Sequence, residues 1–208
     1  MRLALPTALL LLPTLALAQG APAATPAASP APAAGGAAGA LSFLQGKTAD
    51  LKALMGHAAT GERKIRVRAL AESVVDYADL AKRSLKGEWD KRNEAEQGEF
   101  KGLLKSLIER SYLEQVEKKP DFEVKWEDHL LNSRGDMAKV RTLASSGETA
   151  IELEYRLSLR EGGSWIAHDI AIDGVSMVKN YRRSFRREIR KGGWAGLIRK
   201  MRKKLDEG

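Results

Sequence analysis

Apolar residues recur at helical spacing through the first half of the chain. The longest series, with steps of three and four residues, consists of Phe100, Leu103, Leu104, Leu107, Ile108 and Tyr112. Such a stripe predicts a helix with one buried face. Asn93 is suited to cap this helix, and Glu96 falls in the first turn, where the helix dipole favours an acidic side chain. Shorter helices are expected over 41–57, 62–75 and 76–89, the second with Ile65, Ala69 and Leu70 as apolar residues.

The pattern changes to alternation after Pro120, which predicts strands with one apolar and one polar face. The first expected strand contains Phe122, Val124 and Trp126, and further strands are expected over 137–144, 151–160 and 164–172. A Glu-Gly-Gly turn separates the last two. Four antiparallel strands that follow four helices indicate an α+β fold.

The last expected strand runs without a break into a basic helical region. Asp173 and Gly174 supply the turn, and helical spacing resumes at Val175. Two adjacent glycines, Gly192 and Gly193, divide the region into two helices. Their apolar sides consist of Val178, Tyr181, Phe185 and Ile189 in the first helix and of Trp194, Leu197, Ile198, Met201 and Leu205 in the second. Arg and Lys occupy the opposite side of both helices.

The N-terminus predicts export. Residues 1–18 combine an early Arg2, an apolar run and a small-residue end at Ala18, which is typical of a cleaved signal peptide. A retained membrane anchor is the alternative, although two prolines interrupt the run and it is shorter than the ~20 residues of a membrane span. Residues 19–40 are mostly Ala, Pro and Gly and are expected to form an extended linker. Residues 41–208 have the length of one domain.

Charge and cysteine content restrict the partners. The net charge of +8 and the isoelectric point near 9.7 indicate an anionic partner. An exported protein meets lipid headgroups and acidic protein surfaces rather than nucleic acid, so no nucleic acid is expected. The chain has no cysteine, which excludes disulfides, thiol chemistry and a lipid anchor on cysteine.

Motifs for catalysis and metal binding are missing from the sequence. The three histidines, His57, His129 and His168, fall on separate expected elements without the spacing of metal ligands. No Gly-x-Ser-x-Gly motif is present. Asp169 and Asp173 lie four residues apart, and we interpret them as turn residues or internal hydrogen-bond acceptors rather than as a catalytic pair. The sequence therefore predicts neither an enzyme nor a metal or cofactor site.

Several segments taken together resemble one family of periplasmic proteins. The segments are Trp-Ile-Ala-His-Asp-Ile at 165–170, Asp-Gly-Val-Ser-Met at 173–177, the basic helix at 178–189, the Gly-Gly-Trp region at 192–198 and the helices at 76–81 and 100–112. Their content and order, over 44–205, resemble the MlaC family of phospholipid-binding proteins, also known as toluene-tolerance proteins.

The resemblance implies helices packed on a curved four-stranded antiparallel sheet, an NTF2/cystatin-like arrangement with a lipid cavity between the layers. It also implies a monomeric carrier whose cargo is a phospholipid. The implied partners are an outer-membrane lipoprotein complex and an inner-membrane ABC transporter with MCE domains. A further implication of the resemblance is a role in outer-membrane lipid asymmetry.

Candidate site residues come from both expected layers. The acyl chains are expected to contact Leu104, Ile108, Tyr112, Val124, Trp126, Tyr155, Trp165, Tyr181 and Phe185. Each of these residues is also compatible with ordinary core packing. The lipid headgroup or a partner is expected to contact Arg182, Arg183, Arg186 and Arg187, for which a solvated surface is the alternative.

Two other functions remain compatible with the sequence. One is an exported module that lies on anionic membranes through its basic C-terminal helices. The other is an enzyme built on the same scaffold, which would require polar residues to converge inside the cavity.

Overall fold

The computed structural model describes residues 36–58, 60–113 and 121–207, without the side chains of Tyr112 and Leu113. The described elements all belong to a compact unit, Pro32–Gly208. The expected signal peptide at 1–18 and residues 19–35 of the expected linker lie outside the described residues.

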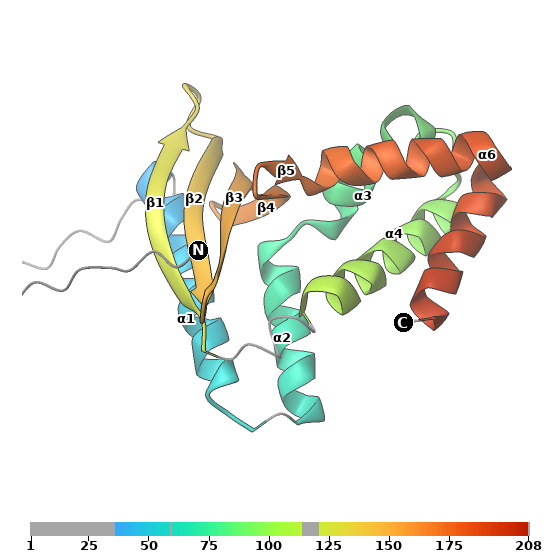
Figure 1. Cartoon of the computed structure of the whole chain (residues 1–208). Coiled ribbons are helices and arrows are strands. Elements are labelled where there is room, and N and C mark those ends of the chain that lie inside the picture. Colours follow the sequence, from blue (N-terminus) through green and yellow to red (C-terminus); the bar gives the residue numbers. More distant parts are fainter. Residues whose placement is uncertain (1–35, 59, 114–120, 208) are drawn as a thin grey trace, which may run out of the picture. The chain divides into compact units, whose positions relative to one another are not determined.

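Four helices and two short helical turns precede the sheet (Figure 1). They are α1 (Ala37–Met55), α2 (Gly61–Val74), α3 (Tyr77–Leu85), the 3-10 turn η1 (Lys86–Glu88), α4 (Glu94–Ile108) and the π-helical turn η2 (Glu109–Leu113). Asn93 caps α4 in a capping box with Glu96, as expected. Helix α1 begins before residue 41, where the domain was expected to start, because alanines favour the helix and Ala40 is fully buried.

The sheet contains five strands rather than the expected four: β1 (Glu123–Leu131), β2 (Met137–Ser146), β3 (Thr149–Leu159), β4 (Trp165–Ile172) and β5 (Val175–Ser176). Neighbouring strands are antiparallel and follow chain order. The fifth strand arises at the Asp-Gly turn, where Asp173 and Gly174 both have positive φ and Val175 pairs with Ile172. Such a turn closes a hairpin, so the final helix begins two residues later than expected.

Helix α6 (Met177–Asp206) consists of two helical pieces that meet at Gly193. The φ of 65° and ψ of −171° at Gly193 are incompatible with a continuous helix, and α6 turns sharply in Figure 1. The expected division at Gly192 and Gly193 is therefore confirmed.

Two clusters of buried side chains hold the unit together. The helical core joins α3, α4 and α6 and includes Leu80, Phe100, Leu104, Phe185 and Leu197. The Phe100 ring meets the Phe185 ring edge-on, with 5.2 Å between the ring centres. The sheet core joins α1 to strands β2, β3 and β4 and includes Leu44, Val140, Leu157, Trp165 and Ala167.

Backbone and side-chain hydrogen bonds connect the sheet to the helices beside it. Val75, between α2 and α3, forms an isolated parallel bridge with Ala167 of β4. The buried carboxylate of Asp169 accepts hydrogen bonds from Arg156 Nη1 at 2.9 Å, Ser176 Oγ at 2.6 Å and the Val178 amide at 3.1 Å. These bonds fix the start of α6 against β3 and β4.

Candidate functional site

A cavity of about 240 Å³ lies between the first two helices and the sheet. Its helical walls consist of Leu44, Lys47, Thr48 and Leu51 of α1 and of Val67, Leu70, Ala71 and Val74 of α2. Leu153 and Tyr155 of β3 and Ile170 and Ile172 of β4 form the sheet wall. The lining is completed, where the cavity meets the helical core, by Val75, Tyr77, Leu80, Ile108 and Met177.

Residue spacing explains why these side chains converge. Val67, Leu70, Ala71 and Val74 are separated by three, one and three residues, which places them on one face of α2. Leu153 and Tyr155 are two residues apart on β3 and therefore project from the same face of the sheet. The apolar face of one layer thus lies opposite the apolar face of the other.

Four polar side chains lie in this otherwise apolar wall: Lys47, Thr48, Tyr77 and Tyr155. Burial raises the pKa of Tyr155 to about 12. Burial and the nearby carboxylates of Glu109 and Glu72 also raise the pKa of Tyr77 above its ordinary range. Both phenols therefore stay neutral near pH 7, and Lys47 is the one formal charge among the described lining residues. The cavity is suited to a mainly apolar ligand with a polar end near α1.

The residues expected to contact acyl chains divide among several locations. Ile108 and Tyr155 line the cavity. Leu104 and Phe185 lie in the helical core, and Trp165 lies in the sheet core.

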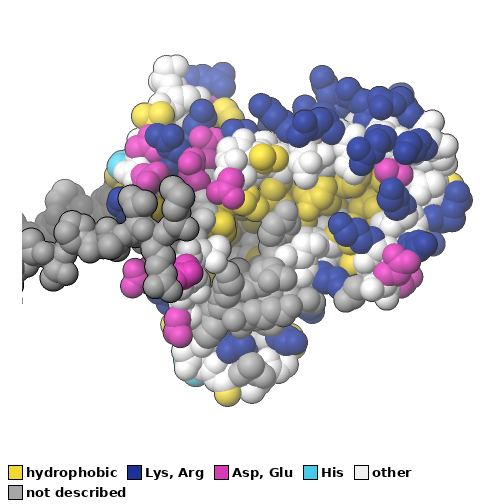
Figure 2. All heavy atoms as spheres, in the orientation of Figure 1, with side chains coloured by type: hydrophobic (Ala, Val, Ile, Leu, Met, Phe, Trp, Pro, Cys, Tyr) yellow, Lys and Arg dark blue, Asp and Glu magenta, His cyan; other side chains and the backbone are white. Residues whose placement is uncertain are grey.

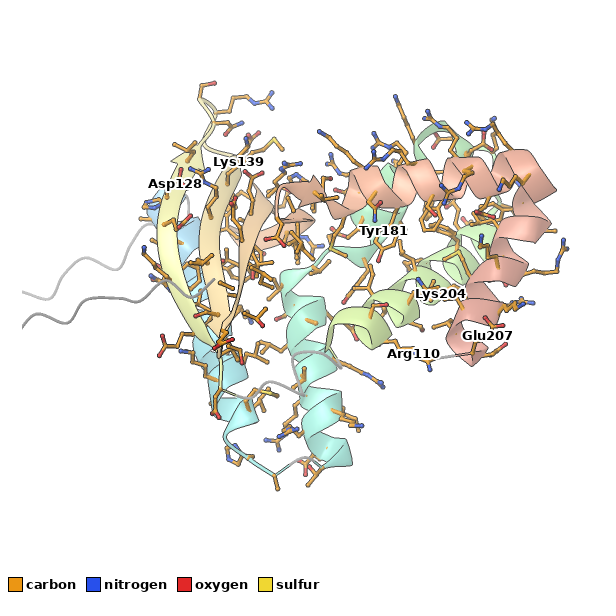
Figure 3. All side chains as sticks on the ribbon, in the orientation of Figure 1. Arg110, Asp128, Lys139, Tyr181, Lys204 and Glu207 are labelled. Carbon is orange, nitrogen blue, oxygen red and sulfur yellow. The ribbon has the colours of Figure 1, made fainter. Side chains whose placement is uncertain are left out.

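Tyr181 packs against the helical core, stacks on Phe185 with 5.5 Å between ring centres and is labelled on α6 in Figure 3. Val124 and Trp126 are half-buried on β1, and Trp126 packs against the sheet core. The Tyr112 side chain lies outside the described residues.

The expected apolar residues of α2 were right for Leu70, which lines the cavity, and wrong for the other two. Ile65 and Ala69, expected to be its apolar residues, are exposed, with 67% of Ile65 accessible to solvent. The inner face starts at Val67, two residues from Ile65 and therefore about 200° around the helix. The three-and-four spacing from Val67 to Val74 was the available signal, but arginines on either side of Val67 obscured it.

The four candidate arginines lie on α6, where Figure 2 shows Lys and Arg side chains gathered. Arg182 donates two hydrogen bonds to the Arg83 carbonyl at the end of α3, from Nε at 3.0 Å and from Nη2 at 2.7 Å. Arg187 lies 3.6 Å from a carboxylate oxygen of Glu188. Arg183 and Arg186 are exposed. Arg182 therefore helps to hold α3 against α6, in addition to any contact with a ligand.

Other polar groups of the described chain have structural roles. Asp173 supplies the turn before β5 and accepts a hydrogen bond from the Glu152 amide at 2.9 Å, and Asp169 is an internal acceptor, as interpreted from the sequence. Within the described residues no group of three or more His, Cys, Asp or Glu side chains is arranged to hold a metal ion. None of the described helices has the length and apolar character needed to cross a bilayer.

Comparisons with known proteins identify a family from the sequence and a shared fold from the structure. A model of the MlaC protein family matches residues 48–203. The structure is similar to that of a phospholipid-binding protein from Ralstonia solanacearum, solved in complex with a phospholipid, with a TM-score of 0.69 and 18% sequence identity. The similarity covers 83% of this chain and 98% of the Ralstonia chain. Among curated proteins, no sequence has a significant match.

Proposed function

The chain belongs to the MlaC family. We propose that it binds a phospholipid, shields the acyl chains in the apolar cavity and carries the lipid through the periplasm. The observation on which the proposal depends is the cavity itself, whose described wall contains apolar side chains, two neutral phenols, Thr48 and one lysine. The similar Ralstonia protein, solved with a phospholipid, supports the same class of ligand.

Shielding acyl chains from water gives such a carrier its physical purpose. A diacyl phospholipid has some thirty methylenes, and at about 0.8 kcal/mol each their transfer into water costs on the order of 20 kcal/mol. Movement through water without a protein is therefore slow. An apolar cavity lowers this cost because the methylenes exchange the membrane interior for an apolar wall.

The cavity must enlarge to hold such a lipid. An engineered cavity of roughly 150 Å³ accepts benzene, and pockets for drug-sized ligands measure roughly 300–1,000 Å³. At about 240 Å³ the present cavity accommodates only part of an acyl chain. Helix α1 belongs to the sheet core through Leu44, whereas α2 contributes no buried residue to either core. We therefore expect α2 to move away from the sheet while both cores keep their packing.

Lys47 and Thr48 indicate where the lipid headgroup would lie. Both belong to α1 and both border the cavity. An ammonium group near the cavity favours a phosphate, and a hydroxyl adds a hydrogen-bond donor. We place the headgroup at α1 and the acyl chain between α2 and the sheet.

Filling the cavity tests the proposal. Ala71 lines the cavity on α2, and an Ala71→Trp variant would fill the space that the acyl chain needs. We expect the lipid that copurifies with the protein to fall at least fivefold, as measured by native mass spectrometry and lipid extraction. The matched control is Ala69→Trp, because Ala69 is exposed on the same helix and should leave the bound lipid unchanged.

A second cavity-filling variant keeps the test valid if Ala71→Trp does not fold. Leu153→Trp introduces the same side chain from β3, on the opposite wall, and should also exclude lipid. Circular dichroism identifies variants that remain folded. Folded Ala71→Trp and Leu153→Trp proteins that carry as much lipid as the unaltered protein would contradict the proposed cavity.

The carrier role also requires exchange with two membrane complexes. We propose that the chain exchanges lipid with an outer-membrane lipoprotein complex and with an inner-membrane ABC transporter that has MCE domains. The exposed Arg183 and Arg187 on α6 are available to acidic surfaces of such partners. Transfer of a labelled lipid between the purified complexes tests this role. Strong cosedimentation with empty anionic vesicles, together with no lipid transfer between the complexes, would instead favour the module that lies on membranes.

A further inference from the structure

A second hollow lies between the end of α3 and the first piece of α6. It has a volume of about 480 Å³ and shares no lining residue with the apolar cavity. Lys86, Gly87 and Lys91 lie on one wall, and Arg182, Arg186 and Arg190 lie on the other. We call it the basic groove. The carrier function proposed above does not use it.

The basic groove has an excess of positive charge that the described residues do not neutralise. Its lining contains five cationic side chains and one carboxylate, Glu88, which pairs with Lys91 at 2.7 Å. The Arg182 guanidinium is occupied by the Arg83 carbonyl. Lys86, Arg186 and Arg190 form no ion pair or side-chain hydrogen bond with the described part of the chain.

The acidic residue nearest in sequence to these arginines is engaged elsewhere. Glu188 lies on α6 between Arg186 and Arg190, but it does not line the groove. Its carboxylate lies 2.8 Å from Lys200 Nζ and 3.6 Å from Arg187 Nε. Glu88 is therefore the one described carboxylate that lines the groove, and the groove keeps a net positive charge.

Ser84 adds a buried hydroxyl without a partner. This residue lines the groove and is only 1% exposed, and its Oγ has no hydrogen-bond partner among the described residues. A helical serine usually bonds to a carbonyl in the preceding turn, and buried hydroxyls are rarely left unpaired. The Ser84 hydroxyl is thus an unpaired donor on a residue that lines the groove, and its Oγ is closed to solvent.

Backbone strain occurs at the same place. Lys86 has a φ of 54° and a ψ of −127°, although residues with a side chain rarely adopt positive φ. This conformation ends α3 and starts η1, and it leads into the part of the wall formed by Lys86 and Gly87. Strained residues of this kind concentrate at binding sites, where the surrounding structure holds them in place.

We propose that the basic groove binds a phosphate-type oxyanion. Arg186 and Arg190 are one helical turn apart, so their guanidinium groups can approach the same anion, and Lys86 faces them across the groove. The unpaired Ser84 hydroxyl turns toward the bound anion and donates a hydrogen bond to it. The anion is either inorganic phosphate in solution or the phosphate of a lipid headgroup at a membrane surface, which present the same chemistry.

The first test measures binding of inorganic phosphate to the full mature chain by calorimetry at low salt. The double variant Arg186→Gln/Arg190→Gln should weaken binding at least tenfold, because two charge-assisted contacts are lost. The control is Arg183→Gln/Arg187→Gln, which removes the same charge from the same helix outside the groove. Equal losses in the two double variants, or no phosphate binding by the unaltered protein, would overturn the proposal.

The second test uses Ser84→Ala. Removing a hydroxyl that lacks a partner should preserve or raise the urea midpoint, while phosphate binding weakens about fivefold because one hydrogen bond to the anion is lost. Unchanged phosphate affinity would exclude Ser84 from the site and contradict the proposed geometry.

Vesicles distinguish the two sources of phosphate. Phosphatidylglycerol vesicles that bind the protein and are displaced by inorganic phosphate would assign the groove to a lipid headgroup. Phosphate binding without vesicle binding would assign it to the soluble anion. Vesicle binding that inorganic phosphate does not displace, and that Arg186→Gln/Arg190→Gln leaves intact, would count against the groove as the headgroup site.

Discussion

At the scale of single residues, Asp169 connects three parts of the fold through one carboxylate. It is almost fully buried and accepts hydrogen bonds from β3, from Ser176 and from the first turn of α6. Loss of this carboxylate leaves two buried donors, the Ser176 hydroxyl proton and the Val178 amide, without an acceptor. Unpaired buried groups cost more than the net value of the bonds that they formed.

Replacing Asp169 should therefore destabilise the protein. We expect Asp169→Ala to lower the free energy of unfolding by about 3 kcal/mol, as measured by urea denaturation. The control is Asp128→Ala, because Asp128 also pairs with an arginine of the neighbouring strand, Arg141, but is exposed to solvent. The control should cause a much smaller loss. Similar losses in both variants would show that the buried network has no special role.

His168 makes stability depend on pH. Burial, aided by the positive charge of Arg83, lowers the pKa of His168 below 6.5 in the folded state, and Ser158 Oγ lies 3.0 Å from its Nδ1. In the unfolded chain His168 binds a proton near pH 6.5, whereas in the folded protein it binds the proton only at lower pH. The contribution of His168 to stability is therefore fully present above pH 6.5 and is lost as the pH falls through the lowered pKa of the folded state. The carboxylates of Asp79 and Asp169 oppose this shift without reversing it.

Urea midpoints at pH 7.5 and pH 5.5 test this dependence. We expect a lower midpoint at pH 5.5, and we expect His168→Gln to reduce the difference between the two. His129→Gln is the matched control, because His129 is exposed on β1. A His168→Gln protein with the same pH dependence as the unaltered chain would contradict this assignment.

At the scale of elements, the division of α6 depends on the backbone of Gly193. Its φ of 65° and ψ of −171° are almost restricted to glycine. The following Trp194 packs against the helical core and lies 5.0 Å from the Arg92 guanidinium. The turn thus directs the second piece of α6 back onto α4.

Two glycine substitutions distinguish the effect of the turn on stability from the effect of helix propensity. Gly193→Ala should lower the free energy of unfolding by about 1–3 kcal/mol because alanine is strained at this backbone conformation. Gly192→Ala should raise it by about 0.5–1 kcal/mol, since Gly192 has no positive φ and an added Cβ would have no atom within 4 Å. Urea denaturation measures both. A gain of stability in both variants would mean that the turn is not required.

The sequence predicted these elements well where local chemistry determines them. Asn93, Gly193 and the alternating strands were recognisable because capping, positive φ and side-chain period depend on a few neighbouring residues. The two-residue strand at Val175 was missed because two residues are too short to show a period. Only its pairing with Ile172 reveals it.

At the scale of the whole described unit, the family resemblance implied a cavity between the layers, but the residue pattern did not show which side chains line it. Leu104 and Ile108 are four residues apart in the same apolar stripe of α4, yet Leu104 lies in the helical core and Ile108 lines the cavity. A cavity is space that the packed layers leave unfilled, and apolar side chains beside it have the same pattern as those in a filled core. The basic groove needed the structure for a similar reason, because Lys86 and Arg190 lie about a hundred positions apart.

The helical core also sets the order in which the chain can fold during synthesis. Contacts between its halves join distant parts of the sequence: Arg182 reaches Arg83, Arg202 pairs with Glu99 and Arg110 bonds to the Leu205 carbonyl, where Figure 3 shows it near the end of α6. The strands, in contrast, pair with their sequence neighbours. A growing chain can form the sheet as its hairpins emerge. The apolar faces of α3 and α4 must wait for the last thirty residues before they are covered.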